Sequence, residues 1–283
     1  MGPGTSQRKV ALITGASSGM GKGFAKALLA EGLIVYAAAR RVEQMADLAQ
    51  EGAIVLKMDI TSDADVRAAA GRIQAAGRGV DVLINNAGFG LYGAMEDTGI
   101  DDARYQFEVN LFGMARVTQA VLPHMRQQRS GTIINVSSMG GRMYTPLGSW
   151  YHASKHAVEG WSDCLRLELA PFGIDVVIIE PGIIDTGFGD VLVEPLLARS
   201  GTSPYRDMAH AVAEATRRSY AAGQASNPGV IVDLVMKAIR ADKPRTRYVA
   251  GRYARALMFL RKWGGDRFFD RLVLSTTRRA GMS

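Results

Sequence analysis

The sequence has little cysteine and no long hydrophobic stretch. Its 283 residues include a single cysteine, Cys164, so no disulfide can form within the chain. No apolar run approaches the about 18 residues that a membrane-spanning helix needs, and the first residues lack a secretory signal pattern. We therefore expect a cytoplasmic protein, with Cys164 buried as a small hydrophobe in the apolar helical stretch 161–169.

Metal-binding patterns are also missing. The chain has four histidines, and no cluster of His, Cys or Asp shows the spacing of a metal site. His152 and His156 flank a lysine on a predicted helix, where we expect them to be surface or partly packed residues rather than ligands. The sequence therefore predicts no metal.

Acidic residues are scarce near the C-terminus. From residue 243 onward there are eleven Lys and Arg but only Asp266 and Asp270, which gives this part a charge of +9. Because the whole chain carries +7, the remainder carries −2. The chain is thus a nearly neutral body with a basic extension. Nucleic-acid binding is not expected, since no recognition fold is evident.

Short apolar runs alternate with helical segments along the chain. The predicted strands are 9–14, 33–39, 53–58, 80–84, 131–136, 174–179 and 248–249, and the predicted helices are 20–31, 42–50, 63–76, 101–129 and 150–172. This alternation is typical of a parallel sheet that is covered on both faces. We expect an α/β fold: a Rossmann-type doubly wound parallel sheet of about seven strands in a single domain.

A glycine-rich turn follows the first predicted strand. Glycines at this place let the backbone turn tightly, and the N-terminus of the next helix offers free N–H groups to an anion. After the first strand of a doubly wound sheet, this pattern favours a dinucleotide site over a turn without a ligand. The predicted contacts are Gly15, Ser17, Ser18, Gly19, Met20 and Gly21.

The end of the second predicted strand indicates which dinucleotide binds. An acidic residue here would hold a free ribose hydroxyl, whereas arginine would hold a 2′-phosphate through its planar fork of donors. The strand ends in Arg40 and Arg41, and no acid follows before Glu43. We therefore predict NADP(H) in preference to NAD(H). The alternative is that these arginines are solvated residues at the start of a helix.

Tyr151 and Lys155 lie four residues apart in a predicted helix, and so on one face of it. A nearby ammonium favours the phenolate, whose parent phenol ordinarily titrates near about 10. Such a tyrosine can exchange a proton with a substrate oxygen. Taken alone, the pair also fits a solvated helix face.

Further motifs occur in order: Asp59-Ile60, Asn85-Asn86-Ala87-Gly88, Asn110, Ser137-Ser138 and Pro181 to Thr186. Together with the glycine turn and Tyr-x-x-x-Lys, they make residues 8–250 resemble the classical short-chain dehydrogenase/reductase family. Ser138 precedes Tyr151 by thirteen residues, as is usual in that family.

The resemblance implies a role for each matching residue. Tyr151 would be the general acid/base, and Lys155 would lower its pKa and bind the nicotinamide ribose. Ser138 would hydrogen-bond the substrate oxygen, and Asn110 would hold a water that links Lys155 to solvent. The implied cofactor contacts, besides the glycine turn, both arginines, Tyr151 and Lys155, are Asp59, Ile60, Asn86, Ala87, Gly88, Pro181, Gly182, Ile184 and Thr186.

The family implies an enzyme that interconverts a ketone or aldehyde with an alcohol. The segment 187–227 is long enough for a lid over an apolar substrate such as a steroid-, retinoid- or lipid-like compound. The expected pocket walls are Phe89, Gly90, Tyr92, Met143, Tyr144, Leu147 and Gly182. The alternative function is a catalytically silent nucleotide-binding scaffold, which normally has lost the tyrosine or lysine.

We expect three parts: a flexible leader at 1–7, a dinucleotide-binding and catalytic domain at 8–250, and a basic amphipathic helical extension at 251–283. The apolar residues of the extension could pack on the body, form a subunit interface or contact an anionic membrane. We favour packing on the body. Peripheral membrane contact through 252–279 is not favoured, and a homo-oligomer, either a dimer or a tetramer, is expected.

Overall fold

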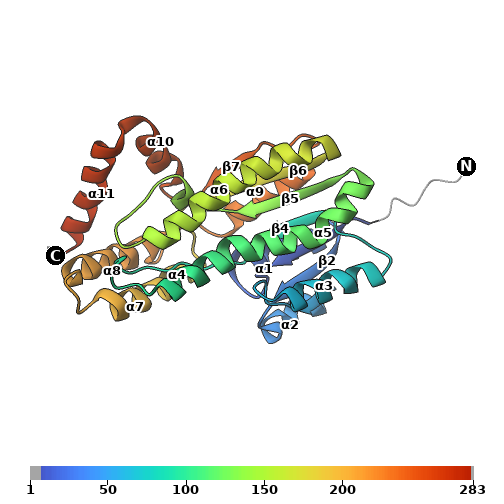
Figure 1. Ribbon diagram of the computed structural model, residues 1–283, viewed down its shortest axis with the longest axis horizontal. Helices are drawn as coiled ribbons and strands as arrows, with labels where there is room; N and C mark the ends of the chain where they lie inside the picture. Colours follow the sequence, from blue (N-terminus) through green and yellow to red (C-terminus); the bar gives the residue numbers. More distant parts are fainter. Residues whose placement is uncertain (1–7, 282–283) are drawn as a thin grey trace, which may run out of the picture.

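The computed structural model describes residues 8–281, so the expected leader at 1–7 lies outside the described residues. Within them, seven parallel strands form one sheet in the order β3-β2-β1-β4-β5-β6-β7 (Figure 1). The strands are β1 Val10–Thr14, β2 Ile34–Ala39, β3 Ile54–Lys57, β4 Val82–Asn85, β5 Gly131–Val136, β6 Ile174–Pro181 and β7 Arg247–Ala250. The predicted doubly wound sheet is therefore confirmed.

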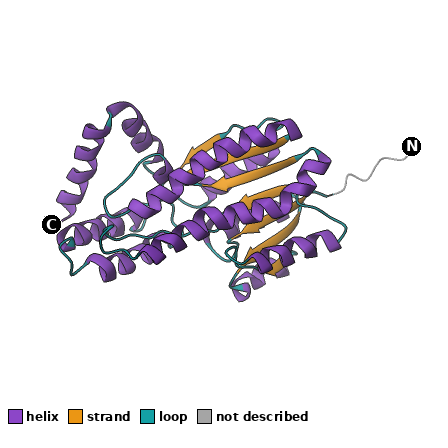
Figure 2. Cartoon of the chain, viewed as in Figure 1, coloured by secondary structure: helices purple, strands orange, loops and turns teal. Residues whose placement is uncertain are grey.

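Helices cover both faces of this sheet, as Figure 2 shows by the purple helices around the orange strands. Side chains of β1 alternate between two cores: Ala11 and Ile13 join one, and Val10 and Leu12 join the other. The first core is closed by α1 (Gly19–Ala30), α2 (Ala46–Gln50) and α9 (Gly229–Arg240). The second is closed by α3 (Asp63–Ala75), α5 (Met114–Gln128) and α6 (Ser149–Leu169). Two-sided burial explains why the strands are nearly continuous apolar runs.

The strand order reverses between β1 and β4. On one side, β2 and β3 follow β1; on the other side, β5, β6 and β7 follow β4. The loops after β1 and β4 therefore run in opposite directions and leave a crevice at the carboxyl ends of these two strands. The glycine turn follows β1, and the Asn-Asn-Ala-Gly segment follows β4. The fold therefore brings these two motifs to the same edge of the sheet.

The predicted helix 101–129 is interrupted in the structure. It begins as α4 (Ile100–Phe107), widens into a π-helical turn, η2 (Glu108–Gly113), and continues as α5. At Gly113, a Cβ atom would lie 2.8 Å from the side chain of Ile60 and 3.1 Å from the carbonyl oxygen of Glu108. Such turns occur frequently at functional sites, and this one carries Asn110.

The segment expected as a lid forms two packed helices, α7 (Phe188–Ser200) and α8 (Arg206–Tyr220). The basic extension forms a helical hairpin, α10 (Ala254–Gly264) and α11 (Asp266–Gly281), and α11 lies against α8 (Figure 1). Three short 3₁₀ turns complete the elements: η1 Val42–Met45, η3 Met139–Gly141 and η4 Ala170–Phe172. The expected domain boundary at residue 250 stays a prediction.

Two other expectations can be compared with the described residues. Cys164 is exposed, so the prediction of a buried cysteine is wrong; it lies on α6 between the buried side chains of Ser162 and Leu165. The helix periodicity turns it outward between these inward-facing neighbours. Among residues 8–281, no helix combines the length and the apolar content needed to cross a membrane.

Candidate active site

The glycine turn forms a close-packed cradle at the start of α1. Gly15 and Gly19 have φ angles of +66° and +53°, in the left-handed region that favours glycine. A Cβ atom at Gly21 would lie 2.3 Å from the carbonyl oxygen of Gly15, so only glycine fits there. Ser18, the residue that precedes α1, makes no side-chain cap, which leaves the N–H groups of the first turn for a ligand. The cradle fits the pyrophosphate of a dinucleotide.

The segment after β4 fastens this turn from the other strand. The Asn86 amide donates to the carbonyl oxygens of Thr14 (3.1 Å) and Gly15 (3.2 Å). In return, the Thr14 hydroxyl accepts from the backbone N–H groups of Asn86 and Ala87, both at 3.0 Å. Asn86 thus shapes the cradle itself, a function that the sequence motif did not reveal.

The two arginines after β2 are exposed. Arg40 donates to the Tyr105 hydroxyl at 3.3 Å, and within residues 8–281 no acidic side chain forms an ion pair with Arg40 or Arg41. Their guanidinium groups are therefore available to an anion. Nearby, the Asp59 carboxylate accepts from the backbone N–H of Thr61 (2.9 Å), and the carbonyl of Ile60 accepts from Arg116 (2.9 Å).

Asn110 is fully buried and joins the loop after β4 to α6. Its Oδ1 accepts from the N–H of Phe89, and its Nδ2 donates to the carbonyl of Phe89, both at 3.0 Å. Nδ2 also donates to the hydroxyl of Ser154 at 3.1 Å. Both amide protons are thus used, and only one lone pair of Oδ1 is left for a water.

Lys155 lies next to Asn110 across Gly88. A Cβ atom at Gly88 would be 3.1 Å from Asn110 Oδ1 and 3.7 Å from Lys155 Nζ, so glycine leaves this space open. Lys155 Nζ donates to the carbonyl of Val136 at 3.0 Å. Burial lowers the pKa of Lys155 to about 8, partly offset by the negative charge of Glu159.

Tyr151 stands in the first turn of α6 with its ring buried. Burial raises the pKa of its phenol well above the ordinary value, the neighbouring Tyr92 adds to this rise, and a hydrogen bond with Ser138 opposes it. The structure therefore differs from the expected depression by Lys155, because the lid has removed the phenol from water. The Tyr151 ring centroid lies 5.8 Å from that of Tyr92 and 5.9 Å from that of Phe188.

His152 is buried, and the expectation of a surface or partly packed residue is wrong. Its Nδ1 lies 2.9 Å from the carbonyl oxygen of Gly140, and its Nε2 accepts from the N–H of Thr145 at 3.1 Å. These bonds hold the loop that joins Ser138 to Tyr151. No sequence pattern could reveal this contact, because it depends on the path of that loop.

A cavity of about 110 Å³ joins these parts beneath the lid. Thr186 lies over the glycine turn, since a Cβ atom at Gly19 would be 3.3 Å from the Thr186 Cβ. The sequence missed Tyr220, which closes the cavity from the end of α8. The lining residues are Met20, Asn86, Gly88, Phe89, Val136, Ser137, Tyr151, Lys155, Pro181, Gly182, Ile184, Thr186, Phe188 and Tyr220.

Not all expected pocket walls face this cavity. Phe89 and Gly182 line it, Tyr92 packs on Tyr151, and Leu147 joins the apolar cluster under the lid. Gly90 meets the lid, because a Cβ atom there would lie 2.6 Å from Leu192 Cδ2. Met143 and Tyr144 instead pack against α11, in a cluster around Phe269.

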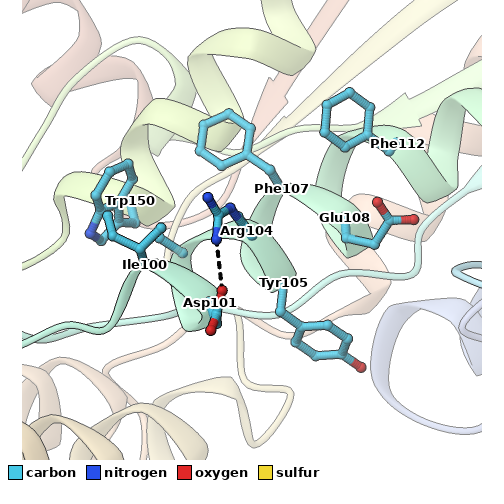
Figure 3. Close-up of a pocket in the computed structure, with 9 residues that line it drawn as sticks. Ile100, Asp101, Arg104, Tyr105, Phe107, Glu108, Phe112 and Trp150 are labelled. Carbon is cyan, nitrogen blue, oxygen red and sulfur yellow. Dashed lines mark hydrogen bonds and ion pairs between the residues drawn. The ribbon is translucent and has the colours of Figure 1, made fainter.

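A larger cavity of about 620 Å³ lies along α4 and the π-helical turn, and Figure 3 shows its side chains. Its lining residues are Ile100, Asp101, Ala103, Arg104, Tyr105, Phe107, Glu108, Phe112 and Trp150. None of the expected catalytic or cofactor-binding residues is among them, so this cavity is not the candidate active site. No group of three or more potential metal ligands occurs in the described part of the chain.

The sequence is similar to proteins of known family. The short chain dehydrogenase family model matches residues 9–195. A 3-ketodihydrosphingosine reductase of Bacteroides thetaiotaomicron is 44% identical over 184 residues, which cover 65% of this chain and 67% of that protein. Oxidoreductase BOA17 of Botryotinia fuckeliana is 38% identical over 249 residues, 86% of this chain and 89% of the relative.

Solved structures show the same fold. A short-chain dehydrogenase from Streptomyces avermitilis matches with a TM-score of 0.77 and 33% identity, covering 91% of this chain and 97% of that one. A Burkholderia phymatum short chain dehydrogenase/reductase in complex with NAD has a TM-score of 0.77 and 28% identity, over 90% and 93% of the chains. A Burkholderia cenocepacia enzyme in complex with NADP has a TM-score of 0.71 and 28% identity, over 92% and 94%. The chain therefore belongs to the short-chain dehydrogenase/reductase family and is an oxidoreductase.

Proposed function

We propose that the protein is an NADP(H)-dependent oxidoreductase that interconverts a ketone or aldehyde with an alcohol on an apolar substrate. The observation that carries this proposal is the Tyr151 phenol, which is buried under a lid in the same cavity as Lys155. This cavity adjoins the glycine cradle, and a bound dinucleotide would place its reactive end there. The site thus joins a proton donor to a cofactor cradle.

The residues divide the chemistry among them. A nicotinamide cofactor bound in the cradle supplies or accepts the hydride. In reduction, Tyr151 gives its phenolic proton to the carbonyl oxygen, and the Ser138 hydroxyl donates a hydrogen bond to the same oxygen. Burial favours the neutral phenol, which is the form that this step requires. The ammonium of Lys155, one helical turn away, then stabilises the phenolate.

The preference for NADP(H) rests on Arg40 and Arg41. The related solved structures carry NAD in one case and NADP in another, so the family alone leaves the choice between them open. Both arginines are exposed at the end of β2, where a 2′-phosphate would lie. Guanidinium groups that are free of acidic partners can bind such a phosphate through paired hydrogen bonds.

The walls of the cavity support an apolar substrate. Phe89, Phe188 and Tyr220 contribute aromatic surface, and Met20 and Ile184 contribute aliphatic surface. The Bacteroides relative is a reductase of 3-ketodihydrosphingosine, a keto compound. By similarity, we propose a ketone on a lipid-like chain, with steroid- and retinoid-like ketones as further members of the test panel.

The experiment is a turnover assay that follows NADPH absorbance with long-chain, steroid-like, retinoid-like and small polar ketones. We expect turnover of the apolar compounds. Tyr151→Phe should lower kcat by roughly a hundredfold to ten-thousandfold, because the proton donor is lost, while NADPH affinity is unchanged. Tight NADPH binding without turnover of any ketone or alcohol would reject the proposal, and wild-type turnover by the variant would remove Tyr151 from its role.

A further inference from the structure

Three aromatic side chains gather at the tip of the α10–α11 hairpin, which we define as residues 259–268. Phe259, Trp263 and Phe268 are 62%, 69% and 47% exposed. The ring centroids of Phe259 and Trp263 lie 6.5 Å apart, and a Cβ atom at Gly264 would be 2.4 Å from the Phe268 ring. Phe259 and Trp263 thus pair on α10, and Phe268 lies against Gly264 across the turn at Gly265.

The tip is exposed although the hairpin itself is anchored. Phe269, the residue after Phe268, is fully buried and meets the Tyr144 ring edge-on at 5.3 Å. The Tyr144 hydroxyl also donates to the Asp270 carboxylate at 2.9 Å. The two sides of the hairpin therefore differ sharply: one packs on the body, and the other holds large aromatic rings in solvent. Exposed apolar surface of this kind marks interaction sites.

Positive charge surrounds the tip. Residues 252–275 contain six Lys and Arg against two acids, and both acids are engaged within the protein: Asp270 by Tyr144 and Asp266 by Arg261 at 2.7 Å. Lys262 Nζ lies 5.0 Å from the centroid of the Trp263 ring. The other cations that are exposed here are Arg255, Arg267 and Arg271. The surface therefore combines interfacial aromatics with uncompensated cations.

We propose that this tip docks the protein on the surface of an anionic lipid bilayer. Trp and Phe would enter the interfacial region, while Lys262, Arg267 and their neighbours would meet lipid phosphates. In Figure 1 the turn between α10 and α11 stands away from the sheet and the lid, so a flat surface can reach it. Docking of the tip on a bilayer does not depend on the proposed reaction.

The hairpin also contacts the loop that leads to the candidate active site. Tyr144 contacts the hairpin through Phe269 and Asp270, and it belongs to the loop between Ser138 and Tyr151. The sequence favoured simple packing of this extension on the body. The buried side of the hairpin agrees with that expectation, whereas the tip leaves its aromatic rings in solvent, and its positive charge is complementary to an anionic surface.

The test is co-flotation of the full chain with vesicles of phosphatidylcholine alone or mixed with phosphatidylglycerol, at low and high salt. We expect binding to the mixed vesicles that weakens as salt rises. Removing both rings in the variant Phe259→Ala/Trp263→Ala should weaken binding by about tenfold or more. Charge reversal by Lys262→Glu/Arg267→Glu should weaken it by about as much. Brominated lipid should quench tryptophan fluorescence in the wild type, and this quenching should weaken in the charge variant, which keeps Trp263.

Leu167→Ala is the matched control, because Leu167 is 70% exposed on α6, outside the hairpin. It should bind as the wild type does, and thermal melts should show that every variant is folded. Three results would overturn the proposal: no binding of the wild type to anionic vesicles, equal binding to neutral and anionic vesicles, or unchanged binding by the ring variant. A dimer that the ring variant abolishes, without vesicle binding, would identify a second copy as the partner instead.

Discussion

His152 is held between two backbone groups, and its position requires one form of the ring. Because a carbonyl oxygen can only accept, Nδ1 carries the proton toward Gly140, and Nε2 must accept from the Thr145 N–H. A second proton on Nε2 would break the hydrogen bond from the Thr145 N–H. Burial accordingly lowers the pKa of His152 to about 4. At the scale of single residues, the protonation state of His152 is thus set by its burial and its hydrogen-bond partners rather than by the ordinary pKa of histidine.

The pH dependence of stability follows from this shift. The folded pKa lies below the ordinary 6.5, so the unfolded chain takes up the proton first as pH falls. Stability is therefore present above pH 6.5 and lost between there and about pH 4, by at most about 3 kcal/mol. Urea unfolding at several pH values across this range should show that the free energy of unfolding changes less with pH in His152→Gln than in His210→Gln, where the replaced histidine is exposed. An NMR titration of His152 near pH 6.5 would contradict the prediction.

Arg40 gives a second prediction at this scale. Arg40→Asp should raise KM for NADPH by roughly tenfold to a hundredfold, because the proposed charged hydrogen bond to the 2′-phosphate would be lost, and should improve use of NADH. Steady-state kinetics with both cofactors measure the change. Arg104→Ala, at an exposed ion pair on α4, should leave the preference unaltered. An unchanged preference in Arg40→Asp would remove this residue from the phosphate site.

At the scale of elements, the contact of the glycine turn with α1 leaves no room for a side chain. Gly15 and Gly21 are so close that the helix begins directly against the strand end. The π-helical turn similarly places Asn110 where it can join the β4 loop to α6. The candidate site is therefore positioned by irregular parts of the chain, namely the glycine turn before α1 and the π-helical turn, whereas the regular helices and strands form the core.

Gly21→Ala tests the cradle. The methyl group would lie 2.3 Å from a backbone oxygen, so the turn must open and cofactor affinity should fall at least about tenfold. Isothermal calorimetry with NADPH measures this. Gly71→Ala is the matched control: a Cβ atom there meets nothing within 4 Å on α3, so the variant should bind normally and gain about 0.5–1 kcal/mol of stability. Normal affinity of Gly21→Ala would contradict the assignment.

At the scale of the whole molecule, a buried ionic network joins α6 to the last strands. Arg247 of β7 lies 3.1 Å from the Glu159 carboxylate and 2.6 Å from that of Asp163, and Glu180 of β6 lies 3.5 Å away. Burial, with the nearby charge of Glu159, raises the pKa of Glu180 well above its ordinary value. Arg142 Nη1 also lies 3.8 Å from both Glu159 and Glu180, so two guanidinium groups offset the repulsion between these carboxylates, and Arg247 is the nearer one.

Arg247→Ala should lower the free energy of unfolding by at most about 3 kcal/mol, because Glu159 and Glu180 then keep only the more distant guanidinium of Arg142, at 3.8 Å from each. The loss should grow as pH rises from 5 to 8, since the raised pKa of Glu180 delays its ionisation and only the charged form needs the cation. Denaturant unfolding at several pH values measures both effects. Arg240→Ala, at an exposed pair with Glu31, should cost less than about 1 kcal/mol. A loss that is independent of pH would contradict the account.

The sequence by itself determined the sheet, the glycine turn and the order of the site motifs. These features depend on local periodicity and on residue types, such as the apolar run of β1 or the i, i+4 pair Tyr151 and Lys155. Their meeting at one sheet edge follows from parallel strands, which all end on the same side.

Only the tertiary structure decided how the site is enclosed and charged. The burial of His152, the lid over Tyr151 and the packing of Tyr144 on α11 all depend on contacts between distant segments. So does the rise in the pKa of Tyr151, because loss of water outweighs the charge expected from Lys155. Likewise, an amphipathic pattern predicted the hairpin helices, but the path of the chain left Trp263 in solvent and buried Phe269.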